Sequence, residues 1–171
     1  MRKKGKGKIN GPFYPWLIEM GSSLAMNKLR KNSEAINVLT MFISKYTYAD
    51  EGKNLCATYR EARPFMSNST FAKAKLWCTA FGFLHCTRFG RLERNSSIYR
   101  LSGKWRHLSG QPEKLDHIEQ LLKRHEEISR TAANNISEKT WKNSSEEQAP
   151  ISAKDWKARE LRKIELEILK Q

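Results

Sequence analysis

The sequence has few of the features that mark secreted, membrane-embedded or disulfide-stabilised proteins. Only 3 of its 171 residues are cysteine, and their spacing is irregular, which favours free thiols in a reducing compartment over a disulfide framework. The longest apolar-rich stretch, residues 76–84, is far too short to cross a bilayer. No apolar segment follows the basic N-terminus, as it would in a secretory signal. We therefore expect a cytoplasmic protein.

The usual sequence motifs of enzymes are also missing. The chain holds no Gly-x-x-x-x-Gly-Lys phosphate loop, no His-Glu-x-x-His helix and no Cys-x-x-Cys pair. Cys78, His85 and Cys86 lie close in sequence, but no fourth zinc ligand accompanies them, and Cys78 fits a helix core position better. The acidic residues of the first 110 positions are too scattered to hold the metal of a nuclease. We expect a protein without catalytic residues, cofactor or metal.

The positive charge is concentrated in one part of the chain. Residues 1–110 hold 20 Lys or Arg and 6 Asp or Glu, a net charge of +14, whereas residues 111–171 hold 12 of each sign and are neutral overall. A region of one charge sign attracts polyanions and speeds encounter with them. Nucleic acid is the commonest such partner, because binding releases its condensed counterions. A basic surface kept only for solubility is the alternative that charge alone leaves open.

The composition divides the chain into five segments. They are a basic disordered arm (1–10), a folded domain (11–110), an amphipathic helix (111–133), a linker rich in Asn, Ser and Glu (134–150) and a C-terminal helix (151–171). Apolar positions recur along one side of the 111–133 helix: Leu115, Ile118, Leu121, Leu122, His125 and Ile128. This side is suited to self-association, to docking a partner and to packing back on the domain.

The first half of the folded domain predicts helices and one short strand. Residues 11–16 form a stiff aromatic entry to a first helix, whose apolar positions run from Leu17 to Leu29. Ser33 is the predicted N-cap of the next helix. Residues 55–58 favour a short strand, and residues 59–62 favour a brief helical turn.

Residues 67–82 predict the helix that matters most for function. Ser67 is its predicted N-cap, and Gly82 suits the positive φ of a helix C-terminus. Apolar positions recur in steps of three and four and so share one buried face: Phe71, Ala74, Cys78 and Phe81. The opposite face is small or polar, with Asn68, Ser69, Ala72 and Lys73. A face of this kind allows a helix to approach base edges closely.

Two strands and a basic turn follow this helix. Residues 83–88 and 97–101 have the composition of paired strands, and residues 89–91 have that of the turn between them. Three arginines gather around the turn, opposed only by Glu93: Arg88, Arg91 and Arg94. A hairpin tip has no core to pack, so its side chains are free to contact phosphates.

The order helix, helix, short strand, helix, hairpin resembles that of winged-helix domains. The Ser-Asn-Ser-Thr sequence at 67–70, the helix that ends at Gly82 and the following Phe83-Leu84 pair are similar to the recognition-helix motif of that family. Further segments are similar to their counterparts in winged-helix domains of phage and plasmid proteins: residues 11–16, 59–62 and 97–101. The resemblance covers about residues 11–105. It implies a mainly α fold with a small β-hairpin wing.

The resemblance also implies binding of double-stranded DNA. In that arrangement Asn68, Ser69 and Lys73 would enter the major groove, where Asn can pair with adenine and Lys with guanine acceptors. The phosphate backbone would meet Thr70, Arg60, Arg63, Arg88, Arg91 and Arg94. The alternative is a structural role in which Asn68 and Ser69 only cap the helix. Lys75 departs from the family, which usually has an apolar residue there.

Phage and plasmid members of this family serve as transcription regulators or as replication initiators that mark an origin. We expect a sequence-specific, nucleoid-associated regulator whose C-terminal helices form a homodimer that matches a two-fold operator. In a second hypothesis, the protein is an origin-binding initiator and the same helices recruit a replisome protein. A third hypothesis, of another class, is a basic module that binds RNA or docks a protein.

Overall fold

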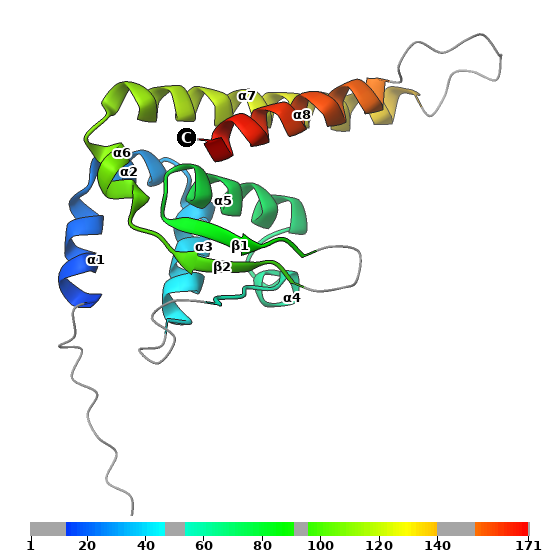
Figure 1. Ribbon diagram of the computed structural model, residues 1–171. Coiled ribbons are helices and arrows are strands. Elements are labelled where there is room, and N and C mark those ends of the chain that lie inside the picture. Colours follow the sequence, from blue (N-terminus) through cyan, green and yellow to red (C-terminus); the bar gives the residue numbers. More distant parts are fainter. Residues whose placement is uncertain (1–12, 47–53, 91–95, 140–152, 171) are drawn as a thin grey trace, which may run out of the picture.

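The protein is mainly α-helical, with a small antiparallel β-hairpin (Figure 1). The computed structural model describes residues 13–46, 54–90, 96–139 and 153–170. Its elements in chain order are α1 (Phe13–Ser22), α2 (Leu24–Leu29), α3 (Ser33–Ser44), α4 (Tyr59–Ala62), α5 (Asn68–Ala80), β1 (Leu84–Arg88), β2 (Ile98–Leu101), α6 (Lys104–Ser109), α7 (Pro112–Lys139) and α8 (Ala153–Lys170). The predicted fold class is confirmed. Among the described helices, none is long and apolar enough to span a membrane.

The basic part of the chain folds around α5. The helix α3 packs along one side of α5, and β1 packs against another (Figure 1). In the hairpin Cys86 lies opposite Tyr99, and two hydrogen bonds of 2.7 and 2.8 Å join Tyr99 to Leu55 at the other edge of β2. The predicted strand at 55–58 is thus reduced to a single bridge, whereas the helical turn at 59–62 is confirmed as α4.

Local bonds fix both ends of α5. Ser67 Oγ accepts a hydrogen bond from Thr70 N at 3.1 Å, which confirms the predicted N-cap. Gly82 has a φ of +76°, and a Cβ there would lie 2.7 Å from the backbone nitrogen of Trp105, so the position requires glycine. The apolar residues predicted to share one face are all buried: Phe71, Ala74, Cys78 and Phe81. Cys78 is thereby confirmed as a core residue.

Several details outside α5 differ from the sequence prediction. The first helix breaks at Ser23, which caps a separate helix, α2. Asn32, not Ser33, is the N-cap of α3, because its Oδ1 accepts a hydrogen bond from Ala35 N at 3.0 Å. The short helix α6 is absent from the prediction, and it places Trp105 in the core.

The helices α7 and α8 form an antiparallel pair that lies across α5 and α6 (Figure 1). The predicted apolar side of α7 is turned inward: Leu115, Ile118, Leu121, Leu122 and His125 are buried, and Ile128 is half-buried. This side packs within the chain, which is one of the three roles considered for it. The helix α7 continues to Lys139, beyond the predicted boundary at residue 133.

Candidate nucleic-acid interface

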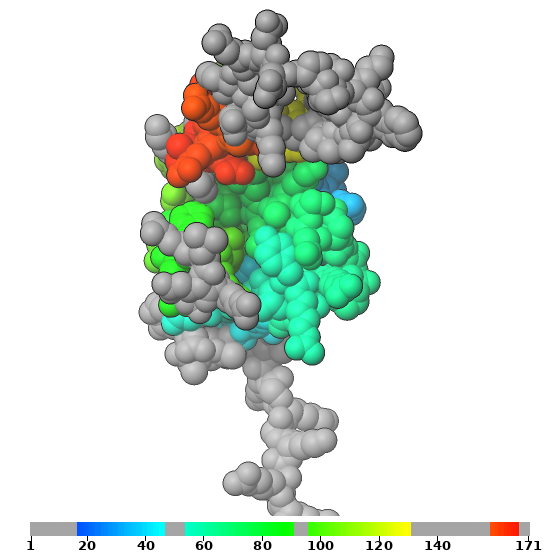
Figure 2. All heavy atoms as spheres, turned by 90° about the vertical axis from the view of Figure 1, so that its right-hand side faces the viewer, coloured from blue at the N-terminus to red at the C-terminus, as the bar shows by residue number. Residues whose placement is uncertain are grey.

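Only the first turns of α5 are open to solvent. Asn68, Ser69 and Ala72 are exposed, whereas Trp77 is buried and its Nε1 donates to Glu126 Oε1 of α7 at 3.0 Å. The helix α8 also packs against α5. Figure 2 looks onto the open end, where α4 and the start of α5 lie together below the C-terminal helices. The helix α5 therefore presents its N-terminal end to a partner, rather than its whole length.

Some polar side chains at this end are already hydrogen-bonded within the protein, and others are not. Ser67 Oγ lies 3.0 Å from Ser69 Oγ and 2.8 Å from Thr70 Oγ1, so both of these hydroxyls belong to the N-cap network. The amide of Asn68 is exposed and forms no hydrogen bond with any residue that the structure describes. The hydroxyl of Ser69 is therefore engaged in the N-cap network, whereas the amide of Asn68 has no described partner.

One open groove lies between α4 and the start of α5, and we name it the arginine groove. Its volume is about 1000 Å³, and it is lined by Tyr59, Arg60, Arg63, Phe65, Met66, Ser67, Asn68 and Ser69. No acidic residue is among these. Arg60 and Arg63 are exposed, and neither forms an ion pair with another described residue. The structure thus brings four predicted site residues together around two unpaired charges.

Hydrogen bonds to Glu61, the one acidic residue of the short helix α4, stabilise this helix. Thr58 and Glu61 form a reciprocal capping box. Lys45 Nζ donates to Glu61 Oε1 at 2.6 Å. The bond from Lys45, followed by that from the Thr58 N–H, lowers the pKa of Glu61 to about 2. Because this carboxylate is engaged by Lys45, it does not neutralise Arg60 or Arg63.

A second groove, which we name the mixed-charge groove, lies between α3, α5 and α7. Its volume is about 510 Å³, and its lining is Lys31, Asn32, Ser33, Glu34, Thr70, Lys73, Ala74, Trp77, Glu119, Lys123, Glu126 and Arg130. Thr70 and Lys73 therefore face a different groove from Asn68 and Ser69. Lys73 is half-buried there. Its contact with a base, and that of Thr70 with a phosphate, remain predictions.

The charges of the mixed-charge groove are mostly paired with each other. Glu119 is 5% exposed, and three lysines donate to it, each at 2.9 Å: Lys28, Lys31 and Lys123. Burial alone would raise the pKa of Glu119, but the hydrogen bonds from the ammonium groups together lower it to about 2. Arg130 lies 3.8 Å from Glu126. This network fastens α2 to α7 and leaves little net charge in the groove.

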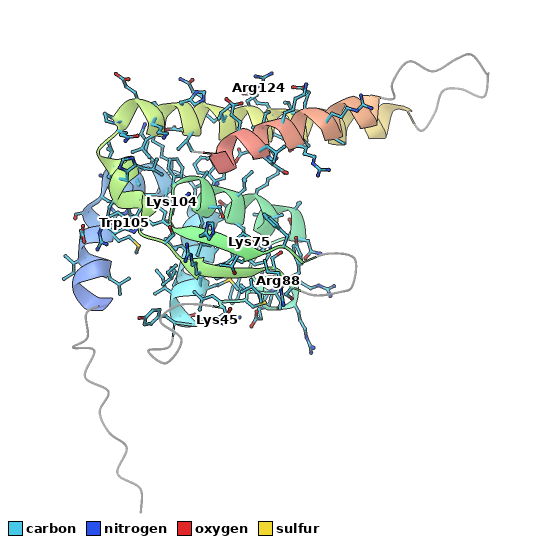
Figure 3. All side chains as sticks on the ribbon, viewed as in Figure 1. Lys45, Lys75, Arg88, Lys104, Trp105 and Arg124 are labelled. Carbon is cyan, nitrogen blue, oxygen red and sulfur yellow. The ribbon has the colours of Figure 1, made fainter. Side chains whose placement is uncertain are left out.

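The hairpin adds Arg88 to the candidate interface. Arg88 is exposed at the end of β1, next to a bulge in the ladder, and forms no ion pair with another described residue. Figure 3 shows Arg88 toward the open end of the hairpin, whereas Arg124 lies on α7, away from it. Arg91 and Arg94 lie outside the described residues, so their contact with phosphates stays a prediction.

Lys75, which departs from the family pattern, lies over aromatic rings. Its Nζ is 4.5 Å from the ring centroid of Phe71, 4.8 Å from that of Tyr59 and 5.8 Å from that of Tyr99. Burial lowers the pKa of Lys75, and the ring faces stabilise the ammonium ion. This contact was not predicted from the sequence. The (i, i+4) spacing of Phe71 and Lys75 is the signal that would have predicted it.

The residues considered for zinc do not form a ligand set. Among the residues that the structure describes, no group of three or more His, Cys, Asp or Glu could hold a metal ion. Cys78 is fully buried in the core. His85 lies in β1, and burial together with the nearby Arg100 and Lys104 lowers its pKa.

Comparisons of the chain with protein-family models, with curated proteins and with solved structures found no match. Function must therefore be inferred from the start of α5, the two grooves beside it and the hairpin.

Proposed function

We propose that the protein binds double-stranded DNA through the start of α5, flanked by α4 and the hairpin. The observation that carries this proposal is the arginine groove, where Arg60 and Arg63 have no described partner and lie beside the free amide of Asn68. Unpaired arginines bind backbone phosphates, and an exposed amide at a helix N-terminus can pair with a base edge. The order α3, Leu55 bridge, α4, α5, β1, β2 also supports a winged-helix arrangement.

The proposal divides the predicted residues between bases and backbone. Asn68 pairs with a base, adenine being the partner that an amide binds bidentately. Ser69 and Lys73 contact neighbouring base edges from the two sides of the helix. The residues assigned to phosphates are Thr70, Arg60, Arg63, Arg88, Arg91 and Arg94. In this division, base contacts give sequence specificity and phosphate contacts give affinity and orientation.

Binding of the full chain to a labelled duplex, measured over a series of salt concentrations, tests the proposal. The logarithm of the affinity should fall linearly with the logarithm of the salt concentration. Arg60→Ala should weaken binding to all sequences alike and reduce that slope by about one. Arg124→Ala is the matched control, because this arginine is exposed on α7 and, among the described residues, pairs only with Glu160, at 4.0 Å. Absence of duplex binding at low salt, or equal losses in both variants, would refute the proposal.

The same assay separates DNA binding from the RNA-binding hypothesis. Duplex RNA has a deep, narrow major groove that a recognition helix cannot enter. The full chain should therefore prefer duplex DNA at moderate salt. A preference for duplex RNA would favour the third hypothesis instead.

A role in transcription regulation is our first choice, with replication initiation as the alternative. Both use the same interface and differ in what the C-terminal helices contact. Outward-facing residues of α8, such as Leu166, which is 51% exposed, remain available to a partner. Sedimentation of the full chain on its selected duplex distinguishes the two. A dimer on a two-fold site supports the regulator, and a monomer that binds a purified helicase or loader supports the initiator.

A further inference from the structure

Three aromatic side chains are exposed among those that the structure describes, and all belong to elements that border the proposed interface. Tyr59 of α4 is 47% exposed, Phe65 of the α4–α5 turn 75% and Phe89 after β1 64%. Exposed apolar surface is unfavourable in water. The other large exposed apolar side chains are aliphatic and lie on α1, α2 and α8. Two of the exposed rings, those of Tyr59 and Phe65, therefore line the arginine groove, whose arginines have no ion-pair partner among the described residues.

The α4–α5 turn holds Phe65 outward through a defined backbone path. Phe65 N and Met66 N both donate to Ala62 O, at 2.9 and 3.0 Å. Ala62 is buried, so the turn is anchored to the core. Met66 is half-buried against that core, whereas the neighbouring Phe65 lines the arginine groove. The turn thus leaves its larger apolar side chain in solvent, and packing within the described chain does not account for this.

The chemistry of the arginine groove indicates what such a ring would meet. Arg60 and Arg63 supply the charge that complements a phosphate backbone. In the major groove of a stacked duplex, the bases display hydrogen-bonding groups and one apolar group, the C5-methyl of thymine. Phe65 shares its groove with Asn68, whose amide suits adenine. The groove therefore holds an apolar side chain, Phe65, that suits the thymine methyl group, and an amide, that of Asn68, that suits the hydrogen-bonding edge of adenine.

We propose that Phe65 packs on a thymine methyl group in the major groove, next to an adenine bound by Asn68. The target duplex then contains A·T pairs under the arginine groove. This inference rests on the proposed function and adds to it an apolar, specificity-determining contact. It also accounts for the exposure of a phenyl ring among arginines.

The test uses the full chain and a duplex that it selects from a random pool. Each thymine of that duplex is replaced in turn by uracil, which lacks only the methyl group. The wild-type chain should lose about fourfold in affinity at one or two adjacent positions, as expected for one methyl-sized apolar contact. Phe65→Ala should bind the thymine and uracil duplexes equally. Ile18→Ala, which removes an exposed apolar side chain from α1, should keep the wild-type discrimination.

Three results would overturn the inference while leaving the proposed function intact, because the duplex is still bound in each. The wild-type chain is indifferent to every uracil, Phe65→Ala keeps the discrimination, or the selected site lacks A·T pairs. A rise in 2-aminopurine fluorescence at the site would also overturn it, because the ring would then be inserted between unstacked bases. Failure to bind any duplex at low salt removes both proposals. Thermal melting of Phe65→Ala verifies that the variant folds.

Discussion

The two grooves that flank the start of α5 both contain cations, but only in the arginine groove do all of them lack an ion-pair partner among the described residues. The mixed-charge groove has four basic residues, Lys31, Lys73, Lys123 and Arg130, against three acidic ones, Glu34, Glu119 and Glu126. The arginine groove has two basic residues and no acidic one. A polyanion binds with the most favourable free energy where no existing ion pair has to be broken first. Under the proposed function, the absence of described ion-pair partners, rather than the number of basic residues, therefore indicates where phosphates bind.

The same contrast holds along the chain. Residues 1–110 carry a net charge of +14, and residues 111–171 are neutral. In the C-terminal helices, polar and charged side chains meet across the α7–α8 contact: Arg124 pairs with Glu160 at 4.0 Å, and His125 Nε2 lies 3.3 Å from Glu165 Oε1. We infer that charge in the C-terminal helices serves packing, while charge on the α4–α5 face is available to a ligand.

The largest expected loss of duplex affinity follows from removing both arginines of the arginine groove. The double variant Arg60→Ala/Arg63→Ala should lose about 100-fold in duplex affinity, because each charge-assisted hydrogen bond contributes roughly 1.5–3 kcal/mol. The loss should be the same for selected and random duplexes, and the salt slope should fall by about two. Fluorescence anisotropy over a salt series measures both quantities.

The matched control removes two cations from the mixed-charge groove. Lys31→Ala/Arg130→Ala deletes the same charge, but both side chains already have acidic partners, Glu119 and Glu126. Duplex affinity should change by about twofold at most. If this variant loses as much as the arginine-groove variant, total charge rather than pairing governs binding, and the comparison between the grooves is wrong.

A second prediction tests the paired groove itself. Glu119→Gln should lower the free energy of unfolding by about 2 kcal/mol at neutral pH, since the carboxylate has a pKa of about 2 instead of the ordinary 4.5. This contribution is present above pH 4.5 and is lost as the pH falls toward 2, because the folded-state pKa is the lower one. Denaturant titrations at several pH values measure it. A difference between wild type and variant that stays constant with pH would exclude the lysine network as its cause.

Asn68→Ala should have an effect of intermediate size. Loss of one bidentate base contact costs about 1–3 kcal/mol of discrimination, or roughly tenfold in affinity for the selected duplex. Binding to random duplex should be unchanged. Ser69→Ala is the comparison, since its hydroxyl already lies 3.0 Å from the Ser67 Oγ, and it should lose less. Equal losses on selected and random duplexes for Asn68→Ala would argue against a base contact.

The smallest effect is expected at Lys75, a cation of the basic part that is engaged within the protein. Lys75→Met removes a positive charge but keeps an unbranched apolar stem beside Phe71 and Tyr59. Duplex affinity should change by less than about twofold, and the free energy of unfolding by less than about 1 kcal/mol. Anisotropy and denaturant titration check the two values. A large loss of affinity with unchanged stability would place Lys75 in the interface.

Local features of the fold could be predicted from the sequence. The Ser67 cap, the buried face of α5, Gly82 and the apolar side of α7 all depend on neighbours within a few turns. The N-cap of α3 was misplaced by one residue, because Asn32 and Ser33 are both good caps and only the backbone path selects between them.

Long-range packing limited the prediction of the candidate site. Lys73 was assigned to the face of Asn68 from helical spacing, but α7 packs beside α5 and builds a separate groove around it. Composition alone does not say where a distant helix will lie. The exposure of Phe65 could not be predicted either, since hydrophobicity favours burial. The turn in which Phe65 N and Met66 N donate to Ala62 O leaves the ring in solvent.

Site-specific crosslinking identifies the surface of the protein that contacts DNA. A photo-crosslinking side chain is placed at position 68 or, as control, at position 124 of the full chain, and each protein is bound to the selected duplex. We expect crosslinks from position 68 to bases in the major groove and none from position 124. A bound duplex that crosslinks equally from both positions, or only from position 124, would show that the start of α5 is not the DNA-binding surface.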